Sequence, residues 1–277
     1  MFLSGAIIMA FIPHQGRGEG GKEQDCEKVR SSSSQESMAL DFWKKELPRV
    51  EAVDLNLSFG KKEALSYANP YTDQEFEFTK QVIHFDSPNW KNDEEEILRL
   101  HGYLLFPENP VDENPGCLAM HGLNGRAETS FSLAYPYLEK GFIVLCHDHP
   151  GHGKSEGPQP SPENFYFEGK YEETAHFYLT LCGAIQGLRV LESLPNVDGK
   201  QIMVTGGSYG ALNTMWLSSI CGNRIQGALP YIAIGDLKKN LDHPDKLIFW
   251  VWDRSPEEIP ADFWHERAPF FDPIYYL

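Results

Sequence analysis

Basic residues are scarce in this sequence of 277 residues: 24 lysines and arginines stand against 40 aspartates and glutamates, a formal net charge of −16 at pH 7. This surplus of negative charge repels phosphate backbones and anionic lipid headgroups, so we expect no nucleic-acid partner and no membrane partner. A chain of this length with 41% hydrophobic residues can nevertheless build one sizeable folded domain. Composition leaves the oligomeric state open.

Cysteine is also sparse, and the five present form neither a metal-ligand spacing nor a disulfide framework. An odd number of cysteines without a framework suits a reducing compartment, so we expect a cytoplasmic protein. Four of them fall in expected strands or helices, where a free thiol acts as a small apolar side chain: Cys117, Cys146, Cys182 and Cys221.

Three closely spaced histidines raise the alternative of a metal site. The pattern H-x-H-x-D-H binds two zinc ions in metallo-β-lactamase-like hydrolases, and His147, His149 and His152 supply its histidines. Gly151 stands where that pattern needs its aspartate. We therefore expect a turn at the end of a strand here, with no metal and no cofactor.

No long hydrophobic run is present. The apolar residues 1–13 are too few to span a bilayer as a helix and lack the basic residues of a signal peptide, although secretion is the alternative localisation. Residues 14–36 are polar and include four consecutive serines. We expect residues 1–37 to be disordered or a spurious extension, because such a composition cannot bury a core, and residues 38–277 to form the domain.

Strand-like and helix-like segments alternate through that domain, which favours an α/β fold: a mainly parallel sheet with helices on both faces. A segment rich in turn formers, residues 87–93, predicts a turn between the first two strands. The expected strands are residues 76–85, 97–106, 117–120, 142–146, 201–205 and 225–234, and the expected helices are residues 127–139 and 171–194.

Residues 206–210 read G-x-S-x-G, with Ser208 at the centre. A β-rich stretch precedes them, and a segment with apolar residues at helical spacing follows. This strand–turn–helix context predicts a nucleophile elbow, a sharp turn that lifts the serine oxygen clear of the sheet. The glycines are needed because flanking side chains would collide with the neighbouring strand or helix.

Two further motifs lie upstream, each after an expected strand. In residues 121–125, H-G-L-N-G, the backbone N–H of Leu123 could meet a developing oxyanion, and Tyr209 N–H would be the second donor. His121 and Gly122 would support this loop, with His121 bracing it by hydrogen bonds. Residues 148–155 have the form D-x-x-G-x-G-x-S, which we interpret as a structural turn.

From about residue 98 onward, these three ordered motifs resemble the α/β-hydrolase superfamily. The nearest branch is that of acetyl xylan esterases, cephalosporin deacetylases and prolyl-oligopeptidase-like enzymes, which residues 194–202 also resemble. The resemblance implies a triad of serine, acid and histidine, the last two on loops after later strands. Residues 209–277 offer too little length for a further βαβ unit beyond the expected ones, so we expect a truncated fold whose last strands are missing.

Other residues could replace the missing acid and histidine. Asp236 follows the strand after the elbow, and His243 and His265 lie in residues 237–270, an aromatic-rich segment that could form a cap. The sequence thus predicts a serine esterase or deacylase acting on a small-molecule ester through Ser208, completed by an acid and a histidine from beyond residue 277 or from a second chain. The alternative is an inactive hydrolase-like fragment or a ligand-binding pseudoenzyme, because a serine without a base is a weak nucleophile.

Overall fold

The computed structural model describes residues 34–68, 75–91, 94–160 and 176–233. The elements in chain order are α1 (Ser34–Ala52), β1 (Ser58–Ala68), β2 (Glu75–Lys91), β3 (Glu94–Phe106), β4 (Asn114–Met120), the 3-10 helix η2 (Ala127–Ser130), α2 (Phe131–Leu138), β5 (Ile143–His147), α4 (His176–Ser193), β6 (Val197–Gly207), α5 (Tyr209–Ile220), the 3-10 helix η4 (Gly222–Arg224) and β7 (Gly227–Tyr231). Within these residues, no helix combines the length and apolarity that crossing a bilayer would require.

The strands form one seven-stranded sheet in the order β1-β2-β3-β5-β4-β6-β7. Its first three pairings, up to β3–β5, are antiparallel, and the pairings among β5, β4, β6 and β7 are parallel. The predicted α/β fold is confirmed, although the sheet is mixed rather than mainly parallel. In its parallel half the strands end at one edge, where the loops after β4, β5 and β6 come together.

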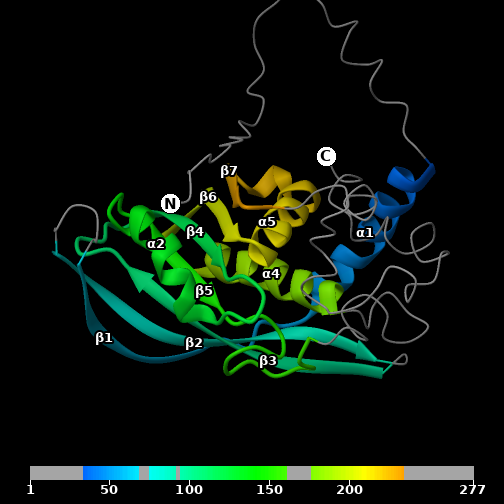
Figure 1. Cartoon of the computed structure of the whole chain (residues 1–277), viewed down its shortest axis with the longest axis horizontal. Helices are drawn as coiled ribbons and strands as arrows, with labels where there is room; N and C mark the ends of the chain where they lie inside the picture. Colours follow the sequence, from blue (N-terminus) through cyan, green and yellow to red (C-terminus); the bar gives the residue numbers. More distant parts are fainter. Residues whose placement is uncertain (1–33, 69–74, 92–93, 161–175, 234–277) are drawn as a thin grey trace, which may run out of the picture.

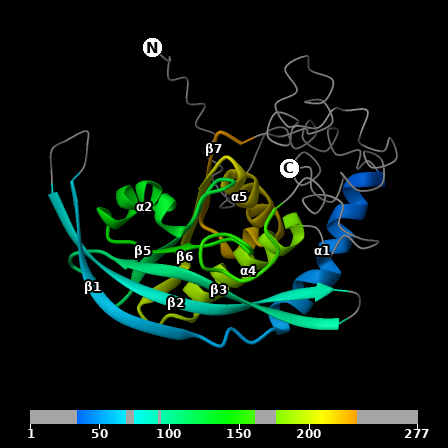
Figure 2. The same ribbon diagram turned by 60° about the horizontal axis from the view of Figure 1, so that its bottom comes forward.

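Helices cover both faces of the sheet (Figures 1 and 2). Helices α1, α4 and α5 pack on one face of the sheet, and α2 packs on the other. A separate hydrophobic core lies between the sheet and the helices on each face. Strand β5 shows how one strand serves both cores: Ile143 and Leu145 point into the first, whereas Val144 and Cys146 point into the second. Its unbroken apolar sequence is typical of a strand buried on both faces.

The turn predicted at residues 87–93 begins too early in the sequence, because β2 continues through Lys91 and its residues 79–91 all pair with β3. Pro88 does not break the strand. Strand β1 pairs with β2 only as far as His84, so the rest of β2 has a partner on one side alone. An unpartnered edge tolerates a residue that has no N–H to donate.

The N-terminal boundary predicted at residue 37 lies within α1, which begins at Ser34. Trp43 and Val50 bury their side chains against the core, so the helix belongs to the domain. Arg224 adds polar ties, since its guanidinium donates to Glu51 of α1 and to Glu192 of α4. Residues 1–33 and the expected cap at residues 237–270 lie outside the described part of the chain.

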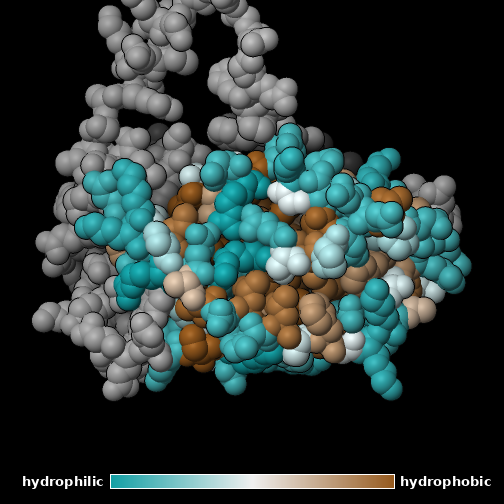
Figure 3. Space-filling view, turned by 180° about the vertical axis from the view of Figure 1, so that it is seen from behind, coloured by the Kyte–Doolittle hydropathy of each residue, from teal (hydrophilic) through white to brown (hydrophobic). Residues whose placement is uncertain are grey.

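The four cysteines expected as apolar filler are confirmed as free and buried: Cys117, Cys146, Cys182 and Cys221. On the molecular surface, a mostly hydrophilic covering is interrupted by hydrophobic residues in the middle of one face (Figure 3). The large hydrophobic side chains exposed among the described residues are Phe59, Ile97, Val111, Tyr231 and Ile232.

Candidate active site

Ser208 occupies the turn between β6 and α5 in a backbone conformation that few non-glycine residues adopt. Its φ is 54° and its ψ is −112°, and its side chain is exposed. The backbone holds this conformation through hydrogen bonds on both sides: Ser208 N–H donates to Tyr231 O of β7 at 2.9 Å, and Ser208 O accepts from Ala211 N–H at 2.9 Å. Such strain is found where surrounding structure enforces it, typically at functional sites.

The two outer glycines of the motif are required by close packing. A Cβ on Gly206 would overlap the carbonyl of Gly210, and a Cβ on Gly210 would overlap the carbonyl of Met120. The carbonyl of Gly210 belongs to the first turn of α5 and that of Met120 to the end of β4. Glycine at these positions therefore allows strand, helix and serine to meet within one sharp turn.

The loop after β4 lies directly against the elbow. A Cβ on Gly122 would stand 3.5 Å from Ser208 Cβ and 3.3 Å from Gly207 O. The loop closes as a β-turn in which Gly125 N–H donates to Gly122 O at 3.0 Å, with Asn124 in the left-handed region at a φ of 60°. Within the described residues, the N–H of Leu123 at the centre of this turn donates no hydrogen bond.

The imidazole of His121 ties this loop to the one after β5. Its Nδ1 lies 2.7 Å from Gly122 O, and its Nε2 lies 3.0 Å from the backbone nitrogen of His149. A backbone N–H can only donate, so Nε2 is the acceptor and Nδ1–H donates to Gly122 O. Burial lowers the pKa of His121 to about 3, which keeps the ring neutral.

The D-x-x-G-x-G-x-S motif is a turn built around the buried carboxylate of Asp148. The carboxylate accepts hydrogen bonds from the N–H groups of Ala127 and Lys154 and pairs with His101 Nδ1 at 2.9 Å. Burial acts to raise the pKa of Asp148, but these hydrogen bonds outweigh it and the pKa is lowered. Gly153 has a φ of 54°, and a Cβ there would overlap the carboxylate.

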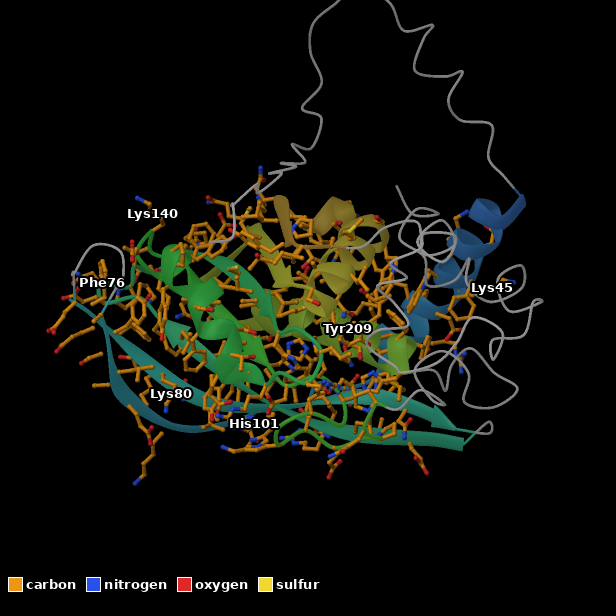
Figure 4. The ribbon with its side chains drawn as sticks, in the orientation of Figure 1. Lys45, Phe76, Lys80, His101, Lys140 and Tyr209 are labelled. Atoms are coloured by element: carbon orange, nitrogen blue, oxygen red, sulfur yellow. The ribbon has the colours of Figure 1, made fainter. Side chains whose placement is uncertain are left out.

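The residue after Ser208 is anchored by its side chain, a contact that motif spacing does not reveal. Tyr209 OH donates to Thr180 Oγ1 of α4 at 2.9 Å and lies 3.2 Å from His176 Nδ1. His176 Nε2–H donates in turn to Pro150 O at 2.9 Å. Tyr209 thus lies inside the molecule near α4 (Figure 4), while its backbone N–H belongs to the first turn of α5, where no helix carbonyl can accept it.

Within residues 34–68, 75–91, 94–160 and 176–233, no histidine is hydrogen-bonded to Ser208. The rings of His121 and His176 are both engaged on their two nitrogens by other groups. The candidates Asp236, His243 and His265 lie outside the described residues. The same part of the chain holds no cluster of histidine, cysteine and acidic side chains suited to a metal ion.

The described residues therefore combine a strained, exposed serine, a loop packed beside it and a mixed sheet covered by helices on both faces. This arrangement defines the α/β-hydrolase fold. The family model of acetyl xylan esterase (AXE1) matches residues 24–234, and the chain belongs to this family.

Two solved structures share the fold. Acetyl xylan esterase 1 from a Thermoanaerobacterium species aligns with a TM-score of 0.58 at 16% identity, over 85% of this chain and 71% of that one. Acetyl xylan esterase from a Paenibacillus species gives a TM-score of 0.58 at 14% identity, over 88% and 75%. No curated protein matches the chain.

Proposed function

We propose that this chain is a serine esterase that removes small acyl groups from a small-molecule ester, with Ser208 as its nucleophile. The observation that carries the proposal is the exposed serine, held at a φ of 54°, with Gly122 packed against it. A binding module has no need of a strained, exposed hydroxyl at this position. Membership of the acetyl xylan esterase family supports acetyl as the acyl group.

In the proposed reaction, Ser208 Oγ attacks the ester carbonyl as its proton passes to a base. The carbonyl oxygen becomes an oxyanion, which the N–H groups of Leu123 and Tyr209 stabilise. The tetrahedral intermediate then collapses, the alcohol leaves with a proton, and an acyl-serine remains. Water attacks this acyl group, releasing the carboxylic acid and restoring Ser208.

The loop residues hold the donors in place for this reaction. The loop lies so close to the serine that a Cβ on Gly122 would touch Ser208 Cβ at 3.5 Å, and His121 fixes the loop to the backbone of His149. Neutral His121 uses both ring nitrogens in these hydrogen bonds, so its proposed role is bracing rather than proton transfer. The proposed base is a histidine outside the described residues, with an acid to orient it.

The test is hydrolysis of p-nitrophenyl acetate by the full chain, compared with Ser208→Ala and with the control Ser219→Ala. Ser219 lies near the end of α5, where its hydroxyl donates to Met215 O, so its loss leaves the turn at Ser208 unchanged. We expect Ser208→Ala to abolish turnover and Ser219→Ala to retain it. Equal rates in folded wild-type protein and Ser208→Ala would instead support the alternative, an inactive hydrolase-like protein.

Single substitutions can then identify the base. His243→Gln and His265→Gln are compared with the wild type, and loss of turnover in one of them assigns that histidine. Turnover that both variants retain would place the base on neither residue. A result of this kind leaves the role of Ser208 unaffected, because the serine is tested separately.

A further inference from the structure

A hollow lies away from Ser208, between α2 and the hairpin of β1 and β2. Its volume is about 210 Å³. Leu138 and Gly141, which line it, stand just before β5, whereas the elbow stands at the edge where the parallel strands end. Phe76 of this hollow and Tyr209 beside the nucleophile are well separated in Figure 4. The hollow is therefore distinct from the proposed active site.

Aromatic side chains form much of its wall. Tyr67 and Phe76 are partners across the β1–β2 pairing, and Phe78 follows two residues later on the same face of β2. From α2, Tyr135 stacks on Tyr67 with an interplanar angle of 18° and lies 5.3 Å from the centre of the Phe78 ring. Phe78 is buried, whereas the half-buried rings of Tyr67, Phe76 and Tyr135 leave aromatic surface facing the hollow.

Carboxylates complete the lining. Glu108 and Glu139 line the hollow and are exposed at its rim, and no lysine or arginine is among the described lining residues. Glu77 borders the hollow from β2, but its side chain points to the opposite face of the sheet from Phe76 and Phe78. Glu139 caps the C-terminal end of α2, so the negative end of that helix dipole adds to the same potential.

We propose that this aromatic and acidic hollow binds a small organic cation of the alkylammonium class. Aromatic faces attract a cation through the negative potential above the ring, and the effect is strongest when several rings surround a weakly hydrated ammonium group. The carboxylates exclude anions and neutralise the bound charge. A neutral apolar ligand would gain the same contact with the rings but nothing from the carboxylates.

The probe is choline, and its control is the neutral alcohol in which carbon replaces the quaternary nitrogen. The two ligands have nearly the same shape, so a difference in affinity reports charge. Calorimetric titrations of the full chain are made at constant ionic strength. We expect choline to bind and the neutral analogue to bind at least about tenfold more weakly.

Substitutions test the two parts of the site. Glu108→Gln combined with Glu139→Gln removes two exposed charges without altering the core, and we expect choline binding to weaken about tenfold. Phe76→Leu keeps an apolar side chain but loses the ring, whereas Phe76→Tyr keeps the ring. We expect binding to weaken about threefold or more in the first and to be retained in the second.

Ser208→Ala separates this site from the proposed active site, since it should leave choline affinity unchanged. Three results would overturn the proposal: no choline binding, equal binding of the neutral analogue, or loss of binding in Ser208→Ala. The last would place choline at the elbow instead. None of these results bears on whether Ser208 hydrolyses esters.

Discussion

His121 and His149 are joined by two reciprocal hydrogen bonds. The backbone N–H of His149 donates to Nε2 of His121 at a distance of 3.0 Å. In return, Nε2–H of the His149 ring donates to the carbonyl oxygen of His121, also at 3.0 Å. The two rings lie with their centroids 4.0 Å apart. The loop beside Ser208 is thereby fixed to the loop after β5, so the position of Leu123 N–H depends on His149, which follows His121 by 28 positions.

Replacing His121 should therefore slow catalysis through a displaced loop. In His121→Phe the ring volume is kept and both hydrogen bonds of the ring are lost. We expect kcat/KM for p-nitrophenyl acetate to fall about tenfold to a hundredfold, since small displacements of a catalytic group have effects of this size. The control His84→Gln, on β2 and away from the elbow, should retain activity. Equal activity in His121→Phe would show that the loop needs no such brace.

The packing around Gly210 predicts a large loss of stability on adding a methyl group. In Gly210→Ala the Cβ would overlap the Met120 carbonyl, which is backbone and cannot move aside. We expect the free energy of unfolding to fall by about 3 kcal/mol or more. Gly199→Ala is the control, because a Cβ at Gly199 meets no atom within 4 Å. Denaturant titrations of both variants measure the difference.

The buried histidines predict a protein that loses stability in mild acid. Burial lowers the pKa of His147 and of His176 to about 4 and that of His121 to about 3, against 6.5 in an unfolded chain. Below pH 6.5 the unfolded state therefore binds more protons than the folded state. Each such group removes about 1.4 kcal/mol per pH unit until its folded pKa is reached.

These three histidines should contribute almost no pH dependence to the free energy of unfolding above pH 7. Between pH 6 and pH 4 we expect them to make the free energy of unfolding fall steeply. The variant His147→Leu removes one of them and should make that slope shallower. Denaturant titrations at a series of pH values measure both slopes. An identical slope in the variant would show that His147 is not held neutral in the folded state.

Asp148 should contribute to stability through the hydrogen bonds that its carboxylate accepts. Its lowered pKa means that this contribution is present above the pKa of an unfolded aspartate and is lost as pH falls through the folded value. In Asp148→Asn we expect a loss of about 2 kcal/mol or more at neutral pH. Asp198→Asn is the control, since this exposed carboxylate also accepts a backbone N–H, from Lys200, and its change should alter stability little.

The strained turn at Ser208 could be predicted because its signals are local. Two glycines, at which any side chain would overlap a backbone carbonyl, lie within residues 206–220 together with the strained serine and the following helix. One short sequence pattern identifies all of these features. The same holds for the turn around Asp148, whose glycines stand at fixed spacing from the carboxylate. Where a short stretch of chain determines geometry, spacing in the sequence carries the information.

The remaining features depend on contacts between distant residues. Thr180 and His176 bind the phenol of Tyr209 from another helix, and neither belongs to a motif. The aromatic hollow needs the β1–β2 register to bring Tyr67 opposite Phe76. At Pro88 the local signal for a turn was overridden because pairing with β3 extends the strand. In each case the pairing or packing partner was unknown from the sequence.

The most direct test of the account is covalent labelling of Ser208. The full chain is incubated with an alkyl fluorophosphonate, which phosphonylates activated serines with loss of fluoride, and is then analysed by peptide mass spectrometry. The account predicts a single adduct on the peptide that contains Ser208, absent in Ser208→Ala and present in Ser219→Ala. A folded wild-type protein that forms no adduct, or one on another residue, would contradict Ser208 as the nucleophile.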